Sequence, residues 1–169
     1  MKSLIYILIL LTITFIGCSP KKTAQELFDE GMKLTTEKKI PEAVNSYESL
    51  LQEYPDNKLA PETIVLLAGI YQNKLLKNIA EKESLNKSVE LFKSIYEKYP
   101  QSKEAPMGLF MAGFVQANEL KDFNAATETY NLFIKLFPDH ELASSAKEEL
   151  NNMGLTPEEI LQKKIAKED

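Results

Sequence analysis

The chain contains no tryptophan, one cysteine and one histidine, and all 20 of its basic residues are lysine. A single cysteine excludes an internal disulfide framework and a zinc site built from thiolates. A single histidine excludes most metal centres and catalytic triads that depend on imidazole. With 25 acidic residues the net charge is −5, which argues against a nucleic-acid-binding surface. These shortages argue against an enzyme, and we expect no metal or other cofactor.

The N-terminus carries an apolar run from Leu4 to Ile16, which follows Lys2. Its length matches the hydrophobic region of a secretory signal peptide, which is about 7–15 residues long. As a helix the run would span about 20 Å, against about 30 Å for the hydrocarbon core of a bilayer. It is therefore too short for a comfortable transmembrane anchor, and we expect residues 1–17 to be a signal peptide.

The only cysteine lies directly after this run, in the sequence Phe15-Ile16-Gly17-Cys18. These four residues resemble the lipobox of bacterial lipoproteins, although Phe15 stands where leucine is usual. The resemblance implies that the Cys18 thiol receives a diacylglyceryl group, that cleavage precedes the cysteine, and that the new N-terminus is acylated. Two or more acyl chains anchor a protein stably, whereas one binds membranes marginally. An ordinary signal peptide with a cysteine near its cleavage site is the alternative.

The residues after the cysteine predict the compartment. Residues 18–22 would form a short lipidated tether. Ser19 is not the aspartate that retains lipoproteins in the inner membrane of many two-membrane bacteria, so the resemblance implies the outer membrane. No acidic cluster follows Cys18 directly, which favours the periplasmic face over export to the cell surface.

The body of the chain is a repeat, because residues 40–55, 85–100 and 123–138 align without gaps. In each copy, apolar sites flank a small residue at a spacing that places them on one face of an α-helix. Each copy ends at a proline, which cannot continue a helix. The aligned columns are Ile40/Leu85/Phe123, Ala43/Ser88/Ala126, Tyr47/Phe92/Tyr130, Leu50/Ile95/Phe133, Leu51/Tyr96/Ile134 and Tyr54/Tyr99/Phe137.

A second helix is expected before each of these segments. A glycine lies in the middle of each expected helix, where it costs about 1 kcal/mol relative to alanine, and we predict that close helix crossing requires it. The second copy holds seven more residues than the third between its two helices, which we expect to form about two extra helical turns. Ser84 and Asp122 are the expected N-caps. The expected helices and their glycines are 23–36 with Gly31, 59–80 with Gly69, and 103–120 with Gly113.

These features together resemble the tetratricopeptide repeat, which is a helix pair with a small residue in the first helix and an alanine, a tyrosine and a closing proline in the second. The third copy carries one extra residue between its glycine and the turn, and the second replaces alanine and tyrosine by Ser88 and Phe92. The matching residues are Gly31, Ala43, Tyr47 and Pro55 in the first copy, and Gly113, Ala126, Tyr130 and Pro138 in the third.

The resemblance implies an all-α, right-handed solenoid of about three tetratricopeptide helix pairs plus a C-terminal capping helix over 141–152. Large residues at Leu50, Ile95 and Phe133 resemble the envelope subgroup that includes BamD-type and YbgF-type proteins. Thr156 to Glu159 read as a capping box that starts a short helix to about Lys164, followed by a charged tail. The expected domains are thus the repeat domain, 23–152, and the C-terminal helix and tail, 153–169.

One surface stripe is a candidate binding site. Met107, Phe110, Met111 and Phe114 share one face of the first helix of the third pair. First helices line the concave surface in this repeat family, and methionine and aromatic side chains suit an adaptable groove for a partner segment. Packing under the next helix is the alternative for the same residues. Similar positions are Phe28, Met32 and Thr35 in the first pair, and Thr63, Leu66, Ile70 and Asn73 in the second.

We therefore expect a non-enzymatic envelope lipoprotein that acts as a protein-binding scaffold, in outer-membrane protein assembly or in Tol-Pal and cell-envelope maintenance. Its partners would be envelope proteins or peptide segments and, through the lipid, the membrane; we expect no nucleic acid and no small-molecule substrate. It would be a monomer outside a complex. A small envelope enzyme or enzyme subunit in peptidoglycan turnover is the alternative, although no catalytic motif occurs and His140 is expected to be an exposed turn residue.

Overall fold

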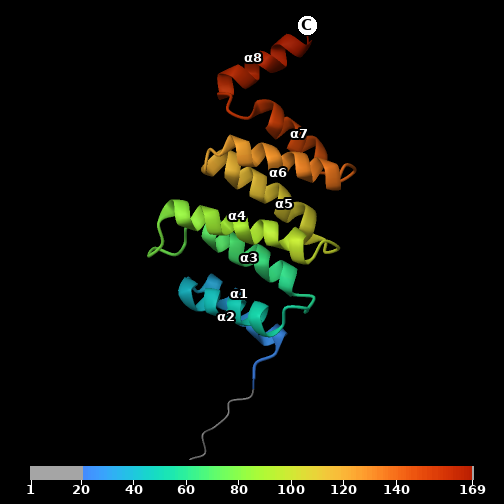
Figure 1. Cartoon of the computed structure of the whole chain (residues 1–169). Helices are drawn as coiled ribbons and strands as arrows, with labels where there is room; N and C mark the ends of the chain where they lie inside the picture. The colour runs from blue at the N-terminus through green and yellow to red at the C-terminus, as the bar shows by residue number, and fades with distance from the viewer. Residues whose placement is uncertain (1–20, 169) are drawn as a thin grey trace, which may run out of the picture.

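The computed structural model describes residues 21–168. The expected signal peptide, residues 1–17, and the expected lipidation site, Cys18, lie outside the described residues, so both stay predictions. All the regular structure of residues 21–168 is helical, and successive helices pack on one another along a single stack (Figure 1). The elements are α1 (Ala24–Thr36), α2 (Ile40–Glu53), α3 (Ala60–Gln72), α4 (Glu81–Lys98), α5 (Glu104–Phe114), the π-helical turn η1 (Val115–Glu119), α6 (Phe123–Leu136), α7 (Ala143–Asn152) and α8 (Pro157–Glu168).

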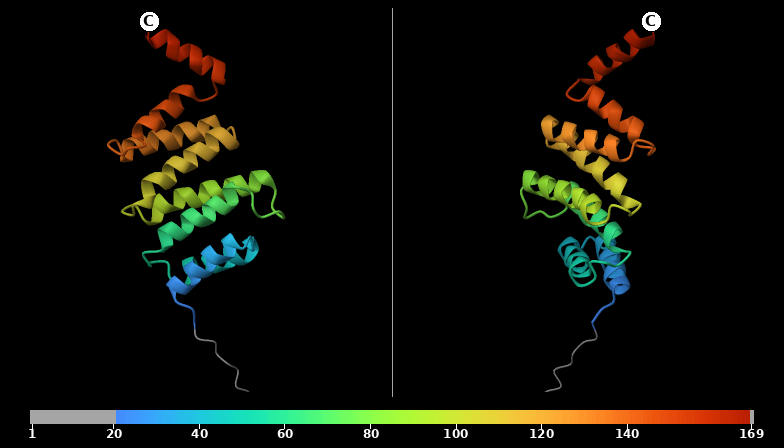
Figure 2. Two further views of the ribbon diagram at one scale, coloured as in Figure 1. Left: turned by 180° about the vertical axis from the view of Figure 1, so that it is seen from behind. Right: turned by 45° about the vertical axis from the view of Figure 1, so that its right-hand side comes forward.

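The stack is an all-α solenoid of helix pairs, as expected. The first helices are α1, α3 and α5, and the second helices are α2, α4 and α6; two further views show the same order (Figure 2). The aligned columns form its core: the small column, the aromatic column and the leucine column of all three second helices are buried. A residue every three or four positions must face inward for a helix to bury one side, and these columns supply it.

The second helices all end in the same way. Tyr54, Tyr99 and Phe137 are the C-caps, with φ values of −135°, −131° and −128°. The Tyr54 hydroxyl donates to the Lys22 carbonyl oxygen, and the Tyr99 hydroxyl to that of Pro55, each at 2.7 Å. Each bond joins the end of a second helix to the chain just before the first helix of the same pair. The tyrosine that precedes the proline therefore fastens the pair at its open end.

The turns inside the three pairs share a backbone conformation. Lys38, Lys74 and Lys121 have φ values of 61°, 53° and 57°, in the left-handed region that glycine usually occupies. In the first pair this residue reverses the chain directly after α1, and the Lys39 N–H donates to the Leu34 carbonyl 2.9 Å away. The first helices therefore stop at turns whose geometry is repeated although the glycine signal is absent.

The extra residue of the third pair forms the π-helical turn η1. After it, the Asp122 N–H donates at 2.8 Å to the Gln116 carbonyl, six residues back, where the corresponding bond of the first pair spans five. A π-turn accommodates one inserted residue without shifting the rest of the helix. Asp122 is the N-cap of α6, as expected, and accepts from the Ala125 N–H at 3.0 Å.

The second pair departs from the expected helices. The prediction of a helix over 59–80 is wrong, because α3 ends at Gln72 and residues 73–80 form a loop that buries Leu76. Only one extra turn is helical, at the start of α4. The expected N-cap Ser84 lies inside α4 instead, and its hydroxyl donates to the Tyr71 carbonyl at 2.6 Å. The loop that buries Leu76 thus takes the place of the other expected turn.

The mid-helix glycines do not all have the same structural role. A Cβ at Gly113 would lie 2.9 Å from Tyr130 Cε1, and one at Gly31 would lie 2.6 Å from Tyr47 Cδ1, so close packing does require both glycines. At Gly69 it does not, because a Cβ there would meet nothing within 4 Å. The buried residue of α3 that corresponds to these two is Ala68, which lies in the same core cluster as Phe92.

The C-terminal helices end the stack. In α7, Ala143 and Ala146 are buried as expected. The predicted capping box is confirmed, since the Glu159 N–H donates to the Thr156 hydroxyl and the Thr156 N–H to the Glu159 carboxylate. The helix that it starts, α8, extends to Glu168, beyond the expected end near Lys164, and projects from the stack (Figure 2). Along residues 21–168, no helix combines the length and the apolar character needed to cross a bilayer.

Candidate protein-binding face

The three first helices present equivalent residues to solvent. Gly31, Ala68 and Gly113 are the buried small residues of α1, α3 and α5. The residue after each of them therefore occupies the same place on its helix, which aligns the three helices residue by residue. We define the first-helix face as three rows of aligned residues that are exposed or half-buried. They are Gln25, Glu62 and Met107; Asp29, Leu66 and Met111; and Met32, Gly69 and Phe114.

Most of the predicted groove residues lie on or beside this face. Met32 and Met107 are 44 % and 38 % exposed, and Leu66, Met111 and Phe114 are half-buried. The side chains of the stripe are therefore partly packed and partly exposed. The sequence alone did not decide whether they form a groove or belong to the core.

Two predicted groove residues belong mainly to the interior of the pairs. Phe110 is half-buried and packs edge-on against Tyr130 and Phe133, with ring centroids 5.5 and 5.9 Å apart. Phe28 is half-buried against the cluster that contains Leu27 and Leu50. These two phenylalanines support the face from one side.

The placement of Ile70 in the groove is wrong, because its side chain is 3 % exposed and packs with Tyr47 in the core. Thr63, at the similar position about two turns earlier, is also fully buried. The residues directly before them, Glu62 and Gly69, are exposed and half-buried, respectively. The sequence analysis therefore placed the outward side of α3 one residue too far toward the C-terminus.

A polar network closes one end of the face. Gln72 Nε2 donates to Glu119 Oε1 at 2.9 Å, and Lys74 Nζ lies 3.6 Å from Glu119 Oε2 and 3.0 Å from Glu81 Oε1. The hydrogen bond to Glu81 is the main reason why the pKa of Lys74 is raised. This network joins the end of α3 to the π-turn and fixes the spacing of two first helices. Sequence reasoning missed it, because no motif links residues so far apart in the chain.

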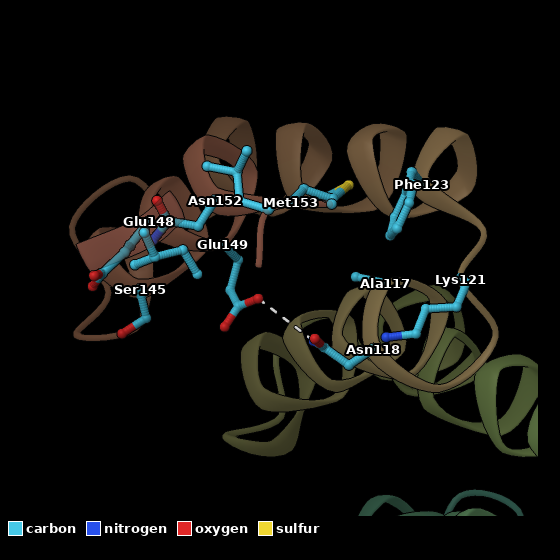
Figure 3. A pocket seen from close by; sticks show the side chains of 12 residues that line it. Ala117, Asn118, Lys121, Phe123, Ser145, Glu148, Glu149, Asn152 and Met153 are labelled. Atoms are coloured by element: carbon cyan, nitrogen blue, oxygen red, sulfur yellow. Dashed lines mark hydrogen bonds between the residues drawn. The ribbon is translucent and has the colours of Figure 1, made fainter. Parts of the chain in front are cut away.

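A cavity of about 680 Å³ lies between η1, the start of α6, α7 and α8 (Figure 3). Asn118 Nδ2 donates across it to Glu149 Oε2 at 3.5 Å, whereas the neighbouring Glu148 points in another direction. Two carboxylates that diverge do not form the paired acid and base of a hydrolase. Lys121, Phe123 and Met153 complete a mixed polar and apolar wall, which suits contact with a polypeptide.

The single histidine has a structural role. His140 is half-buried in the turn before α7, where its Nδ1 accepts from the Leu142 N–H at 3.2 Å and its ring meets Phe133 edge-on. Across the part of the chain that the structure describes, no three side chains among histidine, cysteine, aspartate and glutamate are placed to hold a metal ion.

Comparison with known proteins identifies the repeat. Residues 108–140 match the tetratricopeptide repeat family model, and this stretch runs from Gly108 in α5 to the turn after α6. No curated protein is similar to the chain at a significant level. The third helix pair is thus a tetratricopeptide repeat within an all-α helical-repeat solenoid, an architecture whose surfaces commonly bind other proteins.

Proposed function

We propose that this protein is a non-enzymatic envelope lipoprotein whose first-helix face holds a segment of another protein. The observation that carries the proposal is the exposure of Met32 on α1 and of Met107 on α5, with Phe114 half-buried on the same face of a tetratricopeptide solenoid. Exposed methionine and phenylalanine side chains that line up across several helices mark an adaptable apolar contact surface. The partner would be an envelope protein.

The anchoring part of the proposal rests on Cys18. Its position after an apolar run and Gly17 supports lipidation, and Ser19 supports the periplasmic face of the outer membrane. The described chain begins at Lys21, whose ammonium lies 5.1 Å from the centre of the Tyr54 ring. A lipid at Cys18 would therefore hold the first helix pair within a few residues of the bilayer surface.

The cellular process is the most specific part of the proposal. The large buried residues Leu50, Ile95 and Phe133 support the envelope subgroup that includes BamD-type and YbgF-type proteins. Outer-membrane protein assembly and Tol-Pal or cell-envelope maintenance are therefore the processes in which we place the scaffold.

The binding surface is tested by photo-crosslinking from within the first-helix face. A photoreactive amino acid at Phe114 should crosslink a defined envelope protein in intact cells, whereas the same amino acid at Asn86, exposed on α4, should not. Phe114→Ala should weaken recovery of the crosslinked partner from Met32 while the melting temperature stays close to that of the wild type. A loss of 1 kcal/mol would lower that temperature by about 2–4 °C in a domain of this size. Lost stability with unchanged capture would remove Phe114 from the binding surface.

The anchor is tested separately. Wild-type protein should incorporate a palmitate probe and sediment with outer membranes, whereas Cys18→Ala should remain unlabelled and unprocessed by the lipoprotein pathway. A wild type that takes no label and occurs free in the periplasm would contradict the lipoprotein assignment and leave the binding surface unaffected.

A further inference from the structure

Gly69 leaves a gap in the centre of the first-helix face. Met32 and Phe114 are the aligned residues on α1 and α5, so the row has a bulky apolar side chain at each end and none in the middle. Since a Cβ at Gly69 would meet nothing within 4 Å, contacts within the described chain give no reason for glycine there. A mid-helix glycine costs about 1 kcal/mol relative to alanine. Gly69 is half-buried on this face, and a glycine with open space above it lets a ligand approach the backbone closely.

The charge on the helices around this gap is mainly negative. The elements α1, α3, α5 and η1 hold six carboxylates, at residues 26, 29, 30, 62, 104 and 119, and a single lysine, Lys33. Two of these carboxylates, Asp29 and Glu62, belong to the face. Asp29 accepts from Gln25 Nε2 at 2.9 Å, and within residues 21–168 no cationic group makes an ion pair with either Asp29 or Glu62. Two of the second helices differ, because α4 and α6 combine their carboxylates with five lysines, at residues 82, 87, 93, 98 and 135, whereas α2 has three carboxylates and no lysine.

We infer that this gap seats a cationic amphipathic α-helix of the partner protein, an inference that rests on the proposed scaffold function. The apolar side of such a helix lies against α3 at Gly69, between Met32 and Phe114, and its lysine or arginine side chains meet Asp29 and Glu62. Two helix axes can approach to about 8 Å where the contact residue is small. A strand is disfavoured, because the backbone groups of α3 are already paired within the helix and offer nothing to an added strand.

A displayed peptide library tests the class of partner directly. Random peptides of helical length, encoding basic and acidic residues at equal frequency, are selected against the full-length protein purified in detergent. We expect the selected peptides to be rich in lysine or arginine and to space their apolar residues three and four positions apart. Individual peptides are then synthesised, and their affinities are measured by fluorescence anisotropy.

Variants of the gap and of the carboxylates locate the binding. Gly69→Leu should weaken the selected peptides at least about tenfold by filling the gap, as expected for loss of a central contact. The matched control Asn86→Leu, on an exposed position of α4, should leave affinity unchanged. The double variant Asp29→Asn/Glu62→Gln should weaken binding by about threefold or more, and less at high salt. Glu90→Gln/Glu97→Gln on α4 changes the net charge equally and should have no such effect.

The outcomes separate this inference from the proposed function. Selected peptides that are acidic, neutral or without helical spacing, yet lose affinity with Phe114→Ala, overturn the cationic helix and leave the binding face in place. Basic peptides that bind Gly69→Leu and the wild type with equal affinity also overturn it, because the gap is then not their binding site. If Asp29→Asn/Glu62→Gln and Glu90→Gln/Glu97→Gln lowered the peptide affinity equally, the peptides would be attracted non-specifically to an acidic protein. Selection of no peptide that depends on the face contradicts both the inference and the proposed function.

Discussion

The first and second helix pairs bury the same columns but solve the turn between their helices differently. In the first pair, α1 and α2 are joined by residues 37–39, and Gly31 receives the ring of Tyr47. In the second pair, residues 73–80 join α3 to α4, and Ala68 takes the place of the packed glycine. The glycine of the second helix pair lies one position later, at half-buried Gly69, where a Cβ would meet nothing within 4 Å. A mid-helix glycine therefore serves internal packing in one repeat and has no internal role in the next.

The largest expected effect tests the shared part of the comparison, the buried aromatic column. Tyr47→Ala should lower the free energy of unfolding by about 3–5 kcal/mol, as for other buried aromatic truncations. Tyr130→Ala in the third pair should cost a similar amount, because both side chains are fully buried. Urea unfolding followed by circular dichroism measures both. Near-neutral values at both sites would show that the aligned columns do not carry the stability of the stack.

The next effect breaks the comparison at the glycines. Gly31→Ala should destabilise by about 1–3 kcal/mol, because the new Cβ overlaps the Tyr47 ring and forces repacking. Gly69→Ala should stabilise by about 0.5–1 kcal/mol, because alanine has the better helix propensity and meets no neighbour. The same unfolding experiment gives the sign of each change. If Gly69→Ala destabilised the protein, an internal contact at α3 would have to explain the glycine, and the gap would lose its meaning as a binding feature.

A smaller effect concerns the bond that fastens the pairs. Tyr99→Phe removes the hydroxyl that donates to the Pro55 carbonyl at 2.7 Å and should cost about 1 kcal/mol. The third pair provides the control, because Phe137 occupies the same position without a hydroxyl and packs on Tyr96 and Phe133 instead. Phe137→Tyr should therefore leave the stability nearly unchanged. No cost for Tyr99→Phe would indicate ring packing, and not the hydrogen bond, as the contribution of this column.

The repeat columns explain why most of the fold was predictable from the sequence. A buried face with helical spacing, repeated three times and closed by proline, specifies the second helices almost completely. Two of the first helices, α3 and α5, were harder to place, because their apolar residues are spread more evenly around the helix. For α3, the residues Thr63 and Ile70 fit a helical stripe as well as Glu62 and Gly69 do, and only packing against α4 decides which side is inside. The sequence therefore predicted which three helices form the candidate face, but it placed the outward side of α3 in the wrong register.

The remaining differences arise from contacts that no local signal encodes. The left-handed turn residues are lysines, so the end of α3 at Gln72 carried no glycine to mark it. The bond between Gln72 and Glu119 joins elements 47 residues apart. The π-turn was visible as one extra residue, but its form depends on keeping Gly113 against Tyr130 and Asp122 at the start of α6. Such features follow from the assembled stack.

The smallest expected effect compares the two tyrosines of the aromatic column. The Tyr47 hydroxyl has a partner in the Thr35 hydroxyl, 3.5 Å away, whereas the buried Tyr130 hydroxyl has none among the described residues. An unpartnered buried hydroxyl is unfavourable, so Tyr130→Phe should leave stability unchanged at pH 7 or raise it by up to about 1 kcal/mol.

Burial, aided by the nearby Glu149 charge, also raises the pKa of Tyr130. Above pH 10, where a free tyrosine loses its proton, the unfolded chain is therefore favoured, and stability falls as pH rises toward the folded pKa. Unfolding curves between pH 7 and 11 should show a shallower fall for Tyr130→Phe than for wild type. A loss of more than 1 kcal/mol at pH 7 would mean that the hydroxyl is hydrogen-bonded in the folded protein, whereas identical pH profiles would mean that folding does not raise the pKa of Tyr130.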